Sequence, residues 1–106
     1  METIQYGLKA NTIQKIRNIF ASHPEVEEAI IYGSRAKGNF SNGSDIDFVL
    51  KGKELNRAIL SKIRWQLDDL LLPYTIDIAI YHKIDNPELI EHINRVGEIF
   101  YKKSSM

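Results

Sequence analysis

Two segments of the sequence alternate between apolar and polar residues, which is the pattern of β-strands that bury one face. In residues 45–50 and 75–81 one face carries Ile46, Phe48, Leu50, Ile76, Ile78 and Ile80, and the other carries Asp45, Asp47, Val49, Asp77, Ala79 and Tyr81. Because successive side chains on a strand point to opposite faces, Asp45, Asp47 and Asp77 are expected on the other, solvent-facing side. The chain must therefore fold around a sheet with one carboxylate-bearing face.

Helical periodicity and end signals predict three helices around these strands. The apolar stripes of the first two stop ahead of Pro24 and Pro73, and Asn86 and Pro87 supply an N-cap and a first helical residue for the third, which ends at Gly97. The predicted elements are helices over residues 8–20, 55–72 and 87–96 and strands over residues 26–32, 45–50, 75–81 and 99–101. This set predicts an α/β (α+β) fold with a mixed sheet covered by helices.

The length of 106 residues suits a single domain spanning residues 1–106, with a polar tail from about residue 102 that we expect to fray. Fourteen basic residues balance fourteen acidic ones, so no long nucleic acid partner is expected. The chain has no cysteine and no apolar run long enough to span a membrane, and we expect a cytoplasmic protein.

A glycine-containing segment follows the strand predicted at residues 26–32. It reads Gly33, Ser34, Arg35, Ala36, Lys37 and Gly38, where a strand ends and a short helix can begin. Gly33 allows the backbone to approach a ligand closely, and Ser34 adds a hydroxyl to the free N–H groups of a helix start. Arg35 and Lys37 offer positive charge. The segment is therefore a candidate phosphate-binding loop, although basic residues in such positions are often only solvated.

The acids predicted to share one sheet face form a candidate metal site. Two carboxylates about 5 Å apart repel by roughly 3 kcal/mol at an effective dielectric constant near 20, and a divalent cation relieves that repulsion. Oxygen ligands suit Mg²⁺ or Mn²⁺, whose remaining ligands are often substrate phosphates. Asp68, Asp69 and Asp85 compete with Asp77 for the third position, but strand alternation favours Asp77. His92 has no partner at metal-site spacing, and Trp65 is expected to pack into the protein.

The spacing of these residues resembles a known family signature. Gly33-Ser34, ten intervening residues and then Asp45-Ile46-Asp47 resemble the motif of the DNA polymerase beta-like nucleotidyltransferases. The fuller string GSRAKGNFSNGSDIDFVL is similar to their minimal nucleotidyltransferase (MNT) branch.

The resemblance implies a function for each of these residues. Gly33 and Ser34 would hold the triphosphate of ATP or another NTP, Asp45 and Asp47 would bind Mg²⁺ or Mn²⁺, and Asp77 would be the third carboxylate. It would also bind metal and help to activate the attacking hydroxyl, which displaces pyrophosphate from the α-phosphorus.

The resemblance also implies a partner, because larger relatives carry a helical domain that completes the cleft. In the minimal branch a separate small helical protein, a HEPN or substrate-binding subunit, supplies that wall. The implied role is an antitoxin that binds and adenylylates a HEPN toxin. The alternatives are a catalytic subunit acting on a small-molecule acceptor and a non-catalytic binding module with the same fold. A homo-oligomer is a further way to complete the cleft.

Overall fold

A four-stranded mixed sheet organises the computed structural model, which describes residues 4–41 and 43–104. Its strands are β3 (Glu28–Tyr32), β4 (Ile46–Lys51), β5 (Ile76–Ile80) and β6 (Glu98–Lys102). Their spatial order is β5-β4-β3-β6, with β4 and β5 parallel and the other neighbours antiparallel. The mixed sheet expected from the sequence is confirmed.

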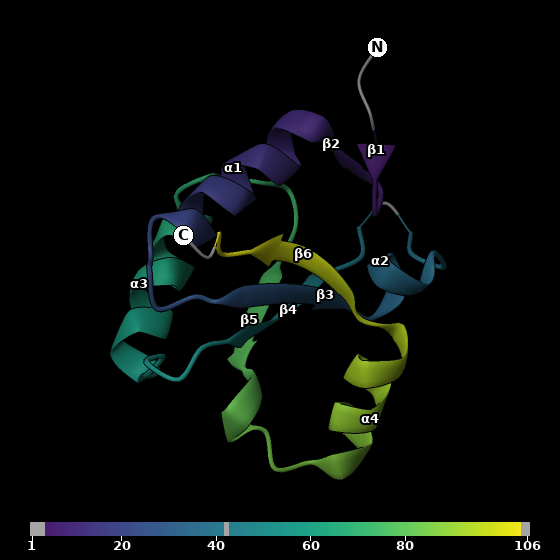
Figure 1. Ribbon diagram of the computed structural model, residues 1–106. Helices are drawn as coiled ribbons and strands as arrows, with labels where there is room; N and C mark the ends of the chain where they lie inside the picture. Colours follow the sequence, from purple (N-terminus) through teal and green to yellow (C-terminus); the bar gives the residue numbers. More distant parts are fainter. Residues whose placement is uncertain (1–3, 42, 105–106) are drawn as a thin grey trace.

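Helices cover both faces of this sheet (Figure 1). They are α1 (Ala10–Ala21), α2 (Ser34–Lys37), α3 (Arg57–Asp68) and α4 (Pro87–Val96), with a 3₁₀ turn η1 (Tyr81–Lys83). The larger core lies between the sheet and helices α1 and α3, and includes Phe20, Ile63, Phe48 and Leu50. A smaller cluster joins Ile30 of β3 and Val49 of β4 to Ile93 of α4 on the opposite face.

The amino-terminal part of the chain differs from its prediction. Residues 8–9, which the apolar stripe assigned to the first helix, form strand β2 (Leu8–Lys9) and pair with β1 (Ile4–Gln5). Tyr6 and Gly7 form the two-residue turn between them, with positive φ at both positions, as a type I′ hairpin turn requires. The sequence did not predict this hairpin, because an aromatic residue such as Tyr6 seldom adopts a positive φ.

The second helix is shorter than its apolar stripe. Helix α3 begins after Asn56, whose side chain accepts a hydrogen bond from the Ile59 amide, and it ends at Asp68 instead of residue 72. Trp65, predicted to pack inward, is 74% exposed. At 100° per residue it points about 160° away from the buried Leu67, so the outward position follows from helix geometry.

The carboxyl-terminal elements follow their sequence signals. Helix α4 has the predicted bounds, and the Asn86 side chain accepts hydrogen bonds from the Glu88 and Leu89 amides. Strand β6 extends through Lys102, and the Lys103 amide donates to the Glu27 carbonyl, so the first residues of the expected tail are held in place. Residues 105 and 106 of that tail lie outside the described residues.

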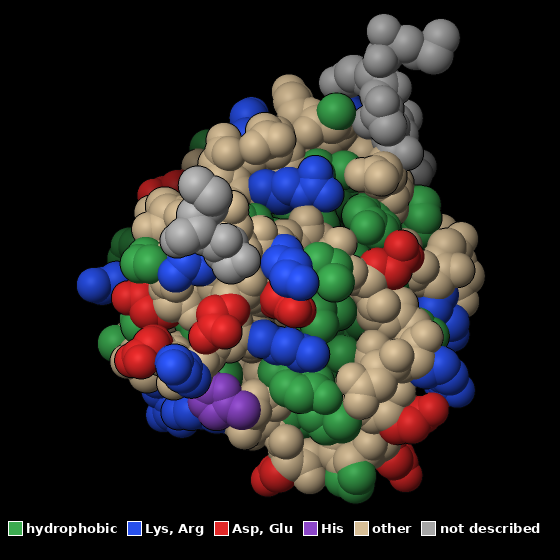
Figure 2. Space-filling model, viewed as in Figure 1, with side chains coloured by type: hydrophobic (Ala, Val, Ile, Leu, Met, Phe, Trp, Pro, Cys, Tyr) green, Lys and Arg blue, Asp and Glu red, His purple; other side chains and the backbone are tan. Residues whose placement is uncertain are grey.

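Charges are mixed over the surface, in keeping with the balanced composition. On the face shown in Figure 2, lysine and arginine side chains are interspersed with aspartate and glutamate side chains. Within residues 4–41 and 43–104, no helix has the length and hydrophobicity needed to cross a membrane.

Candidate active site

The predicted carboxylate strands lie side by side with their acids in register. In the parallel pairing of β4 and β5, Asp47 is the direct partner of Asp77, and Asp45 immediately precedes β4. Neighbouring strands are about 4.8 Å apart, and paired residues project from the same face. The amide of Ile46 also donates to the Thr75 carbonyl, which fixes the starts of the two strands together. The pairing therefore places Asp47 and Asp77 side by side on one face.

The glycine of the candidate phosphate loop meets the carboxylate of Asp47. Tyr32, the last residue of β3, pairs with Asp47 across the antiparallel ladder, and Gly33 follows with φ 77° and ψ −155°. That backbone region is nearly restricted to glycine. A Cβ at Gly33 would lie 2.5 Å from Oδ2 of Asp47. The absence of a side chain at residue 33 thus lets the loop close against the acid.

Burial and like charge act together on the central acid. Asp47 is half-buried, and its pKa is raised by desolvation, by Asp77 and by Asp45, whereas His92 acts in the opposite direction. The pKa of the Tyr32 phenol is raised by burial and by the negative charges of Asp47 and Asp77. The negative charges of Asp45 and Asp77 therefore act on Asp47, and a bound cation would offset them.

The carboxylates of Asp45, Asp47 and Asp77 are not gathered around one point as the ligands of a bound metal ion are. In the described part of the chain, no group of three or more His, Cys, Asp or Glu side chains is arranged to hold a metal ion. Asp45 and Asp77 are exposed, so their carboxylates are free to turn on the surface. The donor set of carboxylate oxygens fits Mg²⁺ or Mn²⁺, which take substrate phosphates as further ligands.

The two basic residues of the loop occupy opposite environments. Lys37 lies exposed on α2. Arg35 is only 2% exposed, and its guanidinium donates hydrogen bonds to the carbonyls of Tyr6 and Ser44. Ser34, at the start of α2, is half-buried. Of the two cations, Lys37 is thus the one whose charge is open to a ligand.

His92 lies beside the acids and was not selected as a site residue by sequence reasoning. His92 of α4 packs edge-on against the Tyr32 ring, with 6.2 Å between ring centroids. Because Tyr32 pairs with Asp47, this contact places His92 beside the acids, where its charge lowers the pKa of Asp47. The sequence offers no signal for this contact, because it depends on α4 packing back over β3 and β4. The helix also covers Val49, which strand alternation assigned to the same face as Asp47. The face is as expected, but the expectation that it is solvent-facing is wrong at Val49, which is buried.

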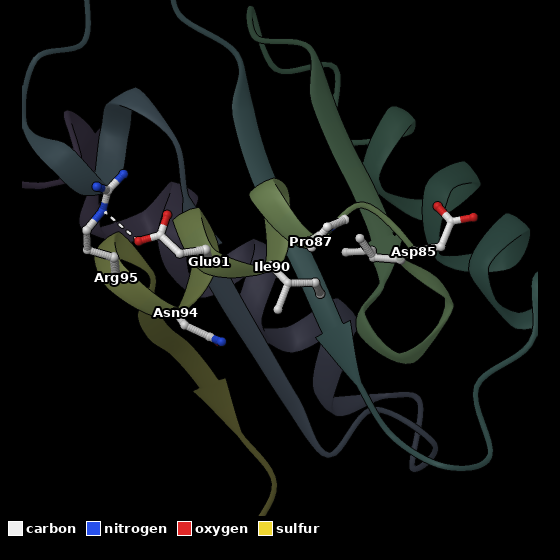
Figure 3. Close-up of a pocket in the computed structure, with 7 residues that line it drawn as sticks. Asp85, Pro87, Ile90, Glu91, Asn94 and Arg95 are labelled. Carbon is white, nitrogen blue, oxygen red and sulfur yellow. Dashed lines mark ion pairs between the residues drawn. The ribbon is translucent and has the colours of Figure 1, made fainter.

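The competing acids lie outside the paired strands β4 and β5. Asp85 borders a surface hollow beside α4, together with Pro87 and Ile90 (Figure 3). In that hollow the Glu91 carboxylate is already paired with Arg95 at 3.7 Å. Asp68 lies at the end of α3 and lines a polar hollow that also reaches Asp77. None of these acids is paired in register with Asp47, so the geometry favours Asp77.

Residues 14–106 match the family described as "Polymerase beta, Nucleotidyltransferase". The chain belongs to this family. The match covers the Gly33-Ser34 loop and all three acids, and it makes the protein a nucleotidyltransferase by class. The resemblance noted in the sequence is thereby confirmed. No curated protein matches the chain.

Solved structures of toxin–antitoxin complexes share the fold. A toxin–antitoxin with AMP-PNP has a TM-score of 0.66 and 18% identity, covering 88% of this chain and 73% of that chain. A tri-AMPylated Shewanella oneidensis HEPN toxin in complex with MNT antitoxin has a TM-score of 0.66 and 15% identity, covering 88% and 71%. The MntA–HepT complex has a TM-score of 0.64 and 15% identity, covering 88% and 72%. The similarity extends over most of each chain and establishes the fold.

Proposed function

We propose that this nucleotidyltransferase transfers AMP from ATP to an acceptor hydroxyl, with Asp45, Asp47 and Asp77 as its metal ligands. The observation that carries the proposal is the in-register pairing of Asp47 with Asp77, directly against the Gly33 turn. A Mg²⁺ or Mn²⁺ ion bound there would neutralise the triphosphate and polarise the α-phosphoryl group.

The residues around the acids have separate roles in this proposal. Gly33 and Ser34 receive the triphosphate, and the exposed Lys37 adds charge. Asp77, on the outermost strand β5, faces the acceptor and takes its proton as the new oxygen–phosphorus bond forms. The bond from the α-phosphorus to the bridging oxygen breaks, and pyrophosphate leaves. The hollow that Asp77 shares with Arg64, Asp68 and Tyr74 provides room for the acceptor.

The role of Asp77 is tested by separating nucleotide binding from turnover. Asp77→Asn should lower the rate of label transfer from α-labelled ATP at least about a hundredfold, because the attacking hydroxyl loses its proton acceptor. Calorimetric ATP affinity should change much less. An unchanged turnover of bound nucleotide would contradict the assignment of Asp77 to the acceptor side.

We further propose that the acceptor is a HEPN toxin for which this chain is the antitoxin. The similar solved structures include an AMPylated HEPN toxin bound to an MNT antitoxin, and the similarity covers 71% of that chain. Strand β5, which carries Asp77, is an edge strand of the four-stranded sheet, and a second protein bound there would complete the acceptor side.

The partner proposal is tested by incubating the chain with each α-labelled NTP, Mg²⁺ and the small helical protein encoded next to it. The proposal predicts label on a tyrosine of that helical protein, with ATP as the preferred donor. A protein without label, together with a labelled small molecule, would instead support the metabolic alternative.

A further inference from the structure

Arg35 is a buried cation that ties three segments of the chain together beside the acids. Its Nη1 donates to the Tyr6 carbonyl at 2.8 Å, and its Nε and Nη2 donate to the Ser44 carbonyl at 3.2 and 2.9 Å. The guanidinium carbon also lies over two aromatic rings, 5.2 Å from the centroid of Phe40 and 4.7 Å from that of Tyr74. We call this set of contacts the Arg35 clamp.

The contacts of the clamp offset the free-energy cost of burying the positive charge of Arg35. An arginine removed from water needs hydrogen-bond acceptors and a favourable electrostatic surface around it. Two backbone carbonyls provide the acceptors, and two ring faces provide negative potential. Tyr6 belongs to the positive-φ hairpin turn, and a Cβ at Gly7 would lie 2.9 Å from Nη1 of Arg35. The hairpin is therefore shaped around the guanidinium.

Two of the clamped groups are next to the proposed metal ligands. The Ser44 carbonyl belongs to the peptide bond that leads into Asp45. Its turn is closed by the Ser41 amide, which donates to the Ser44 hydroxyl at 2.8 Å. Tyr74 precedes Thr75, whose carbonyl accepts the Ile46 amide at the start of the parallel pair. Holding Ser44 and Tyr74 on one guanidinium thus fixes where β4 and β5 begin.

We infer that Arg35 is a positioning residue for the metal-binding acids, Asp45 foremost, in place of the phosphate ligand suggested by its place in the sequence. This inference rests on the proposed metal site. The geometry gives the reason: the three donors that make hydrogen bonds point to backbone carbonyls, and the guanidinium lies between two rings. The exposed Lys37 remains the cation available to phosphate.

The two roles predict opposite effects on metal binding without nucleotide. An arginine that contacts only phosphate repels Mn²⁺ slightly, so its removal leaves Mn²⁺ affinity unchanged or raises it. An arginine that positions Asp45 supports metal binding, and its removal lowers the affinity. Losses of about tenfold or more are typical when groups that orient metal ligands are removed.

Arg17 provides a matched control within the same chain. Its Nε donates to the Phe100 carbonyl at 2.8 Å, and its guanidinium carbon lies 5.0 Å from the Phe100 ring centroid. It thus combines a backbone carbonyl and an aromatic ring, as Arg35 does, but it joins α1 to β6 on the opposite face from the acids. Arg17→Lys reports the cost of losing such contacts away from the acids.

The test measures Mn²⁺ binding by electron paramagnetic resonance in nucleotide-free wild type, Arg35→Lys, Arg35→Ala and Arg17→Lys, with a melting temperature for each. Arg35→Lys keeps the charge and most of the volume, so it remains informative if Arg35→Ala fails to fold. We expect Arg35→Lys to weaken Mn²⁺ binding about tenfold and Arg17→Lys to change it less than about twofold.

Wild-type Mn²⁺ affinity, or a higher one, in the folded Arg35→Lys variant would overturn the positioning role. An equal loss in Arg17→Lys would also overturn it, because a general loss of stability would then explain both. Failure of the wild type itself to bind Mn²⁺ would instead refute the metal site of the proposed function. Turnover gives a second readout: Arg35→Lys should lower kcat more than it raises the KM for ATP.

Discussion

At the scale of single residues, the site depends on a glycine that touches an acid. Gly33 occupies a backbone region that other residues reach at a cost of about 1–3 kcal/mol, and its missing Cβ leaves room for Oδ2 of Asp47. An added methyl group would be accommodated most easily by turning the Asp47 carboxylate away. The candidate phosphate loop and Asp47, a proposed metal ligand, are therefore structurally coupled through one position.

Gly33→Ala should lose both stability and metal affinity, whereas Gly38→Ala should lose mainly stability. Gly38 has φ 87° as well, but a Cβ there would meet nothing within 4 Å. We expect each variant to lower the free energy of unfolding by about 1–2 kcal/mol in urea titrations. Only Gly33→Ala should also weaken Mn²⁺ binding. Equal Mn²⁺ affinities in the two variants would show that Gly33 does not act through Asp47.

The raised pKa of Asp47 gives a pH-dependent prediction. In the metal-free folded chain, burial and the charges of Asp77 and Asp45 hold this pKa above its ordinary value of 3.8. Stability from the protonated form is therefore present below that value and is lost as pH rises through the folded-state pKa. In EDTA, the stability of Asp47→Asn relative to the wild type should increase as the pH rises above about 4, and the difference should become constant once the pH has passed the folded-state pKa.

Added Mg²⁺ should reverse that order of stability, because it stabilises the wild type and has less effect on Asp47→Asn. Thermal unfolding followed by circular dichroism measures both effects. Asp45→Asn, at an exposed position, is the comparison and should change metal-free stability less. A constant difference between Asp47→Asn and the wild type across the pH range would contradict the electrostatic description of the site.

At the scale of elements, helix α4 completes the face that carries the acids. Its buried Ile93 packs on Ile30 and Val49. These two residues lie two positions along their strands from Tyr32 and Asp47. Gly97 ends the helix in an extended conformation, and a Cβ there would lie 2.7 Å from the Ile30 side chain. The same Cβ would lie closer still to the Ile93 carbonyl oxygen, so contacts with the end of α4 and with β3, rather than a left-handed cap, require glycine at this position.

Ile93→Ala should destabilise the chain far more than Ile90→Ala on the same helix. Ile93 is 2% exposed, and removing three methyl or methylene groups from such a site costs about 2–5 kcal/mol. Ile90 is only partly buried and borders the surface hollow, so its loss should cost less than about 1.5 kcal/mol. Urea unfolding of both variants compares them, and equal losses would mean that α4 is not anchored through the Ile93 cluster.

At the scale of the whole molecule, local signals predicted most of the fold. Strand alternation placed Asp47 and Asp77 on one face, and Asn86, Pro87 and Gly97 marked the bounds of α4. The pairing of β4 with β5 and the closure of α4 over Val49 depend on contacts between distant segments, which no local pattern encodes. The Tyr6 turn and the burial of Arg35 were missed for the same reason, since each is stabilised by the other.

The four-stranded sheet leaves the acids of β4 and β5 accessible, which is why we expect the chain to work with another protein. Helices α1 and α3 cover one face, and α4 packs over β3 and β4 on the other (Figure 1). Asp77 stays exposed on the edge strand, where an acceptor can approach. The whole arrangement thus leaves the reactive end of the sheet open to a second molecule.

The most direct test of the central claim is transfer of label from α-labelled ATP by wild type, Asp45→Asn and Asp47→Asn, in the presence of Mg²⁺ and the neighbouring helical protein. The proposed site predicts transfer by the wild type and a loss of at least about a hundredfold in each variant, with circular dichroism spectra unchanged. Transfer at the wild-type rate by either folded variant would contradict the assignment of these acids as the metal-binding centre.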